Sequence, residues 1–122
     1  MLRNCYLLNG YTGGLSFNED YTSAAFACSE TPDANGPKIA VAIQANGTMD
    51  ITTITNTLNG IEVFCAFVDG RSVWVGADLG TIVYSRRNGD VILPDVFSPG
   101  NFFMLDMQML SGAFYIGGYI AS

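Results

Sequence analysis

Apolar residues in this 122-residue chain come in short runs that are rich in Val, Ile, Phe and Tyr and bounded by Gly, Asn or Pro. The clearest run, 61–68, is followed by Asp69-Gly70 and then by a second run at 72–76. Asp-Gly between two such runs predicts a hairpin, because a type I′ turn needs positive φ at both central residues. Similar turns recur along the chain, so the pattern predicts an all-β fold built as an antiparallel meander.

The segment 51–58 carries two competing patterns. Ile51, Ile54 and Leu58 have helical spacing, and Gly60 would cap a short helix. The threonines between them are β-branched and lower the stability of a helix. We therefore favour a strand here, with a short helix as the alternative.

A repeat emerges when Gly80 is aligned with Gly47 and Gly13. Residues 73–84 then match 40–51 and 6–17, and a truncated fourth copy begins at Phe114. The alignment predicts a single domain over 1–122, with repeats at approximately 6–39, 40–72 and 73–113 and a half repeat at 114–122.

The repeated unit resembles the inner hairpin of a β-propeller blade. Residues 76–82, Gly-Ala-Asp-Leu-Gly-Thr-Ile, resemble a degenerate Asp-box turn of the sialidase-like propellers, with Gly76 where that turn has Ser or Thr. Ala45 and Tyr11 replace its Asp in the other copies. The resemblance implies propeller-like blades in which this turn is structural.

Propellers close with about four to eight blades, more than this chain holds. Two solutions remain open. The chain closes as a compact fold, such as a β-trefoil or another β barrel or sandwich, or it assembles with a second subunit. We expect a homo-oligomer, because the apolar tract 102–110 would otherwise leave a sheet edge open.

Charge and targeting signals restrict the partners. The formal net charge is −6, from 5 basic and 11 acidic residues, so we expect no binding to nucleic acid or to an anionic membrane. No apolar signal sequence follows Met1, and the apolar tract 102–122 contains Asp106, Gln108 and a Ser111-Gly112 turn, which a membrane span would not.

The cysteines predict the compartment. Cys5, Cys28 and Cys65 lie among apolar neighbours without C-x-x-C spacing. We interpret all three as buried free thiols, which favours folding in a reducing cytoplasm.

Catalytic chemistry has little support. The chain contains no His, which removes Ser-His-Asp and Cys-His nucleophile systems and the commonest general base. We expect no cofactor and no metal, and interpret the dense acidic triplet 18–20 as a solvated loop. The chain is therefore expected not to be an enzyme. A hydrolase that uses two carboxylates stays open, with these candidates: Asp50, Glu62, Asp69, Asp78, Asp90, Asp95 and Asp106.

Candidate binding residues come from the aromatic side chains and the basic pair. Tyr11 and Tyr119 occupy equivalent bends of the repeat. Trp74 also offers an aromatic face, although we favour core packing or a subunit interface for this residue. Arg86-Arg87 beside Asn88-Gly89 is interpreted as a solvated hairpin tip, with phosphate or carboxylate recognition as the alternative. The full set of candidates is Tyr11, Trp74, Asp78, Tyr119, Arg86 and Arg87.

Together these features predict a non-enzymatic structural or interaction module that assembles through its sheet edges. Its composition is acidic, rich in Gly, Asn, Thr and aromatics, and holds a single lysine, Lys38. That composition resembles viral and phage particle components, which implies incorporation into a virion. The alternatives are a small lectin-like protein that binds carbohydrate or another small ligand, and an inhibitor or sponge that binds a host factor.

Overall fold

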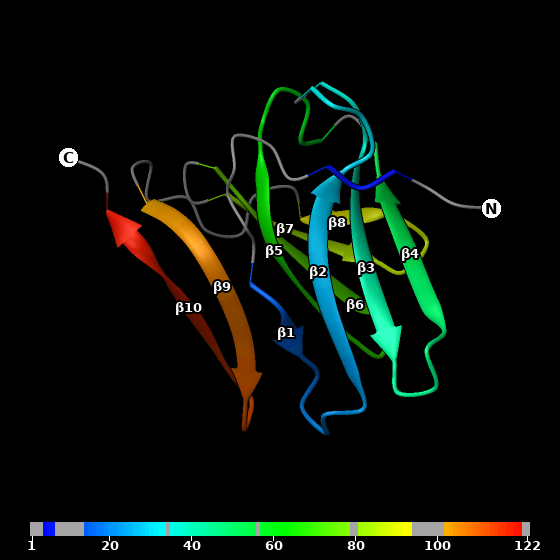
Figure 1. Cartoon of the computed structure of the whole chain (residues 1–122). Coiled ribbons are helices and arrows are strands. Elements are labelled where there is room, and N and C mark those ends of the chain that lie inside the picture. The colour runs from blue at the N-terminus through cyan, green and yellow to red at the C-terminus, as the bar shows by residue number, and fades with distance from the viewer. Residues whose placement is uncertain are drawn as a thin grey trace.

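The computed structural model describes residues 4–6, 14–33, 35–55, 57–78, 81–93 and 102–120. These residues form three antiparallel sheets and contain no α-helix (Figure 1). The predicted all-β, antiparallel class is therefore confirmed. Within this part of the chain none of the sheets closes into a barrel. No helix in it is long and apolar enough to cross a membrane.

The first sheet has the order β1-β2-β3-β4. Its strands are β1 (Ser16–Phe17), β2 (Ser23–Ser29), β3 (Lys38–Gln44) and β4 (Met49–Ile54). Strand β4 covers the first half of the segment 51–58, which also has helical spacing. The strand interpretation is correct there, and Leu58 follows in a turn with its side chain buried. The β-branched threonines and the pairing with β3 outweigh the helical spacing of three residues.

The second sheet is a meander with the order β5-β6-β7-β8. Its strands are β5 (Val63–Asp69), β6 (Ser72–Ala77), β7 (Ile82–Arg86) and β8 (Val91–Leu93). The predicted hairpin at Asp69-Gly70 forms, but its predicted turn type is wrong. Asp69 pairs with Ser72, so Gly70 and Arg71 are the central residues, and only Gly70 has a positive φ, of 56°. A two-residue turn of type II′ has glycine in its first central position and needs a positive φ only there.

The third sheet is the hairpin of β9 (Phe102–Leu110) and β10 (Ala113–Ile120). Ser111 and Gly112 form its predicted turn, and both have positive φ, as a two-residue type I′ loop requires. The hairpin packs on the face of the second sheet opposite the first sheet, and its strand β9 runs beside β1 (Figure 1).

The sheets pack as three layers because the second sheet is apolar on both faces. One face, which includes Val73, Val75 and Val83, packs against small side chains of the first sheet, such as Ala27 and Ala40. Small residues on β2 and β3 let the two backbones approach closely. The opposite face packs on the β9–β10 hairpin through a cluster of Cys65, Phe67, Ile82 and Met107.

Two of the segments aligned as repeats form comparable structures. Residues 40–51 lie in the β3–β4 hairpin, and residues 73–84 lie in the β6–β7 hairpin. These hairpins occupy different places in their sheets, the third and fourth strands in one and the second and third in the other. Most of the segment 6–17 lies outside the described residues. The repeat and the propeller resemblance therefore stay predictions.

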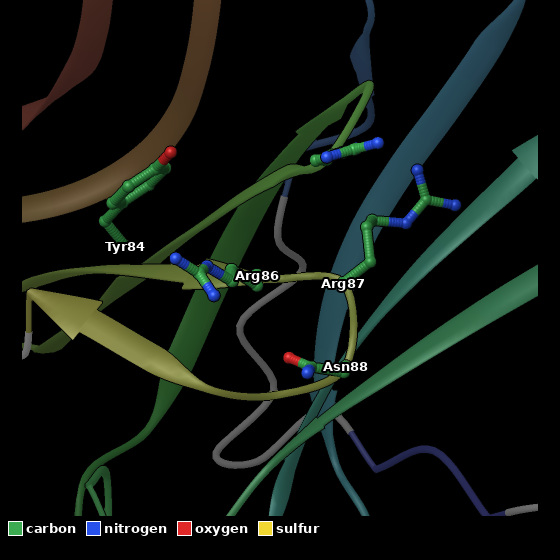
Figure 2. Close-up of a pocket in the computed structure, with 5 residues that line it drawn as sticks. Tyr84, Arg86, Arg87 and Asn88 are labelled. Carbon is green, nitrogen blue, oxygen red and sulfur yellow. The ribbon is translucent and has the colours of Figure 1, made fainter.

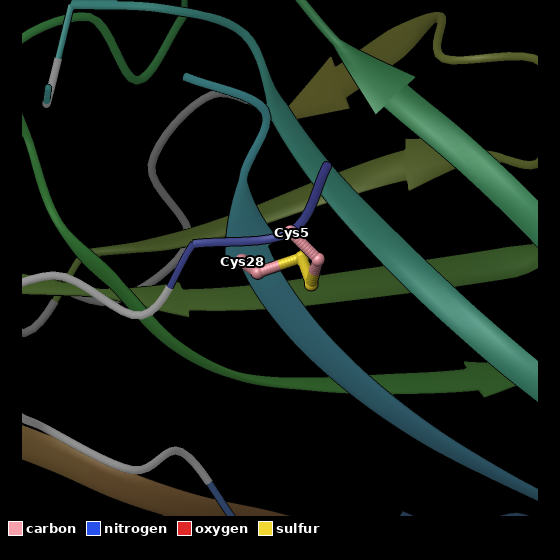
Figure 3. Close-up of a disulfide and its surroundings, with 2 residues drawn as sticks. All are labelled: Cys5 and Cys28. Atoms are coloured by element: carbon pink, nitrogen blue, oxygen red, sulfur yellow. A yellow bond between two sulfur atoms is a disulfide. The ribbon is translucent and has the colours of Figure 1, made fainter. Parts of the chain in front are cut away.

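The cysteine prediction is wrong for two of the three thiols. Cys5 and Cys28 form a disulfide, with their Cα atoms 5.4 Å apart (Figure 3). It fastens the N-terminal segment to β2, beside a pair of backbone hydrogen bonds between Tyr6 and Ser29. Sequence spacing could not reveal this pairing, because a disulfide needs only that the chain bring two Cα atoms within reach.

Cys65 is the free, buried thiol that the sequence predicts. Burial raises its pKa to about 12, and the negative charge of Asp106 adds to the increase. Its thiol therefore stays protonated at neutral pH and serves as a small apolar side chain between the second sheet and β9.

Candidate functional site

Sheet edges are the first candidate sites, because an unpaired strand edge is a template for another chain. Most edges of the described sheets are protected. Strands β1 and β8 are only 2 and 3 residues long, and β5 is buried from Val63 to Val68. Short or buried edges offer little to a partner.

The edge of β4 is covered by the β7–β8 turn. Arg87 Nη2 forms an ion pair with Asp50 Oδ2 at 2.8 Å, and its Nη1 donates to the carbonyl oxygen of Gly70 at 2.7 Å. The Thr52 hydroxyl donates to the carbonyl oxygen of Arg87 at 2.9 Å. A side chain on Gly89 would overlap the carbonyl oxygen of Thr53. The turn therefore joins the second sheet to the edge of the first.

Strand β9 is also flanked on both sides. It pairs with β10 on one side, and β1 contacts its other side, where the Ser16 hydroxyl donates to the carbonyl oxygen of Met107 at 2.6 Å. The Gln108 side chain accepts from the backbone N–H of Phe17 at 3.1 Å and donates to the carbonyl oxygen of Phe17. The tract 102–110, which the sequence suggested as an open edge, is thus partly covered.

Strand β10 has the long free edge. Among the described residues it pairs with β9 alone, over 8 residues that include no charged residue and no proline. Phe114 and Ile116 are partly buried against the second sheet, whereas the side chains of Tyr115 and Ile120 are 58% and 69% exposed. Charged residues and proline are the usual protection of an edge strand, and β10 has neither.

Trp74 is partly buried and packs against neighbouring aromatic rings. Its ring centroid lies 4.3 Å from that of Tyr84 and 5.1 Å from that of Phe114, so it is part of the contact between β6 and the β9–β10 hairpin. The Tyr84 hydroxyl lies 3.2 Å from the Ser72 hydroxyl. Packing, the favoured interpretation of Trp74, is what the geometry supports over an exposed stacking platform.

The remaining candidates of the aromatic site are Asp78, Tyr119 and Tyr11. The backbone of Asp78 bonds to Glu62 and Thr81 in the turn after β6, and Asp78 does not line the pocket described below. Tyr119 pairs with Phe103 in the hairpin backbone. The Tyr119 side chain and the whole of Tyr11 lie outside the described residues, so a shared aromatic site stays a prediction.

Several acidic residues are engaged in structural contacts. Asp50 binds Arg87 and Gln44, and the carboxylate of Asp106 accepts from the Met107 amide at 2.9 Å. In the acidic loop, the hydroxyl and the amide of Thr22 donate to Asp20, which lowers the pKa of that carboxyl group. Asp95 lies outside the described residues.

The basic pair contributes to a pocket of about 540 Å³ (Figure 2). Its lining residues come from strand β7 and from two turns at the same end of the second sheet: Arg71, Tyr84, Arg86, Arg87 and Asn88. The sequence prediction included Arg86 and Arg87 but missed the other three. In a meander, alternate turns lie at the same end, and this rule could have placed Arg71 beside them.

The three arginines of the pocket differ in their partners. Arg87 is held by Asp50 and Gly70, whereas the structure records no ion pair for Arg71 or Arg86 among the described residues. Figure 2 shows the Arg86 and Arg87 side chains extending to different sides of the turn. The amide nitrogen of Asn88 donates to Asp90 at 3.0 Å, which fixes the turn between them. Two guanidinium groups thus remain available to a ligand.

Comparison with known protein families, curated proteins and solved structures finds no match for this chain.

Proposed function

We propose that this chain is a non-enzymatic interaction module that forms a homo-oligomer through the free edge of β10. The long, uncharged and exposed edge of that strand is the observation that carries the proposal. The other described edges are short, buried or covered, so β10 is where addition of a strand costs least.

The second copy of this chain is the partner that fits the edge. Two β10 strands can pair antiparallel about a twofold axis, which presents the same surface on both subunits and closes the assembly. Each hairpin has two strands, and an isolated two-stranded sheet is marginally stable. Pairing through β10 would produce a four-stranded sheet, matching the strand number of the other two sheets.

The composition supports a role for this assembly in a larger particle. An acidic chain with 13% charged residues exposes uncharged polar groups and aromatic rings, and it resembles viral and phage particle components in this respect. Edge-to-edge joining supplies the contacts that such a component needs, with no catalytic residue required.

Light scattering coupled to size-exclusion chromatography tests the proposal. The unmodified chain should elute with at least twice its monomer mass of 13.1 kDa. Tyr115→Lys places a charge on the exposed edge strand and should give a monomer with an unchanged circular dichroism spectrum. Tyr21→Lys is the matched control, because Tyr21 is also an exposed tyrosine, 67% accessible, but belongs to the β1–β2 connection and not to β10.

The outcomes separate clearly. A monomer in the unmodified chain at micromolar concentration would refute self-association. An oligomer that survives Tyr115→Lys but not Tyr21→Lys would place the interface near β1 and refute the role of β10.

A further inference from the structure

We infer that the pocket between the β5–β6 and β7–β8 turns binds a small ligand through its phosphate or carboxylate group. This inference is independent of assembly through β10, because no residue of β9 or β10 lines the pocket.

The charge distribution is the first argument. The chain has 5 basic residues against 11 acidic ones, yet three of the basic residues line this one cavity. Guanidinium groups around one cavity repel each other. In such an acidic chain, neighbouring carboxylates could readily neutralise their charges. Among the residues that the structure describes, only Arg87 of the three has such a partner, Asp50. A bound anion would balance the charges of Arg71 and Arg86.

The fixed position of Arg87 is the second argument. Its two hydrogen bonds, to Asp50 and Gly70, join the β7–β8 turn both to β4 and to the β5–β6 turn. Arg71 follows Gly70 directly, so this contact sets the distance between the turns that carry Arg71 and Arg86. Two arginines presented from separate, fastened turns can grip one oxyanion from two sides, because each guanidinium offers a planar fork of donors.

The shape of the cavity is the third argument. A volume of about 540 Å³ suits a small molecule rather than a polymer. Tyr84 forms one wall, and its ring is held by stacking on Trp74 and by the contact of its hydroxyl group with Ser72. A rigid aromatic wall beside free guanidinium groups is suited to an organic anion with an apolar part.

Trp74 provides a direct measurement, because it is the only tryptophan and it stacks on the wall of the pocket. Its fluorescence is titrated with inorganic phosphate in one arm and with succinate in the other, at constant ionic strength kept by sodium chloride. We expect a saturable change with at least one of them. A response to phosphate alone identifies a phosphoryl ligand, and a response to succinate alone identifies a carboxylate.

Two variants make the titration specific. Arg71→Gln and Arg86→Gln each remove a free guanidinium and should weaken binding at least about tenfold, the loss typical of a charge-assisted hydrogen bond. Asn46→Asp changes the net charge by the same amount in the β3–β4 turn and keeps the side-chain oxygen that accepts from Thr48. It should bind as the unmodified chain does.

The failures are equally distinct. The absence of a saturable fluorescence change with either anion, confirmed by calorimetry, would overturn the inference. Equal losses of binding affinity in Asn46→Asp and Arg86→Gln would also overturn it. The same titration on Tyr115→Lys should give unchanged affinity, so that failure of self-association and failure of the pocket are observed separately.

Discussion

At the tip of the β7–β8 turn, two adjacent arginines differ in what they contact. Arg87 binds Asp50 and the Gly70 carbonyl, whereas Arg86 is exposed in the pocket. We expect Arg87→Gln to lower the free energy of unfolding by about 1 to 2 kcal/mol, since it removes a charge-assisted bond and a partly exposed ion pair. Arg86→Gln should change it by less than about 0.5 kcal/mol.

Urea unfolding of the two variants measures this difference. The pair is its own control, because both changes remove one positive charge from the same turn. Equal losses of stability would mean that Arg87 does not fasten the turn to β4.

At the scale of secondary-structure elements, the backbone of the β7–β8 turn lies close against the backbone of strand β4. Gly89 has a φ of 92°, and a Cβ there would overlap the carbonyl oxygen of Thr53. Gly47 has nearly the same φ, 88°, but its Cβ would meet no atom within 4 Å. The two glycines therefore separate backbone strain from steric contact between sheets.

We expect Gly47→Ala to cost about 1 to 2 kcal/mol, the usual penalty for a left-handed residue. Gly89→Ala should cost at least about 1 kcal/mol more, because the turn must also move off β4. Thermal unfolding of both variants tests the contact, and equal shifts in Tm would contradict it.

The disulfide should stabilise the attachment of the N-terminal segment to β2. Cys5 and Cys28 are separated by 23 residues, and a loop of that size predicts a stabilisation of about 3 kcal/mol. A phosphine reductant should therefore lower the Tm of the unmodified chain and leave that of Cys5→Ser unchanged. Thiol titration in denaturant should find one free thiol, Cys65; three free thiols would contradict the pairing.

The sequence predicts those elements whose determinants are local. Asn88-Gly89 and Ser111-Gly112 are correct turn positions, because each turn needs a residue at a positive φ, which Gly89 supplies at 92° and Gly112 at 79°. The threonines of β4 likewise favour a strand from their own conformational preference. Strand composition and turn chemistry therefore suffice for the fold class.

Contacts between distant segments could not be predicted in this way. Cys5 meets Cys28, and Arg87 meets Asp50 at a separation of 37 residues, only after the sheets have packed. The candidate pocket depends on the same step. Arg86 and Arg87 are recognisable in the sequence as a basic pair. The meander of the second sheet brings Arg71 beside them, and the Tyr84 ring, which packs on Trp74, completes the lining.

At the scale of the whole molecule, the three-layer packing of the described strands leaves β10 as a long exposed edge. The second sheet is covered on both faces, by the first sheet and by the β9–β10 hairpin. The hairpin shields one apolar face of that sheet and presents β10 on its outer side. Assembly through β10 would extend this third layer without disturbing the packing of the other two.

Hydrogen exchange at low and high protein concentration tests this assembly most directly. If β10 pairs with a second copy, amides within 113–120 should exchange more slowly at high concentration, while those of β2, β3 and β6 keep the same rates. The Tyr115→Lys variant should lose the concentration dependence. Exchange over 113–120 that is the same at both concentrations, in a chain that light scattering shows to be oligomeric, would contradict pairing through β10.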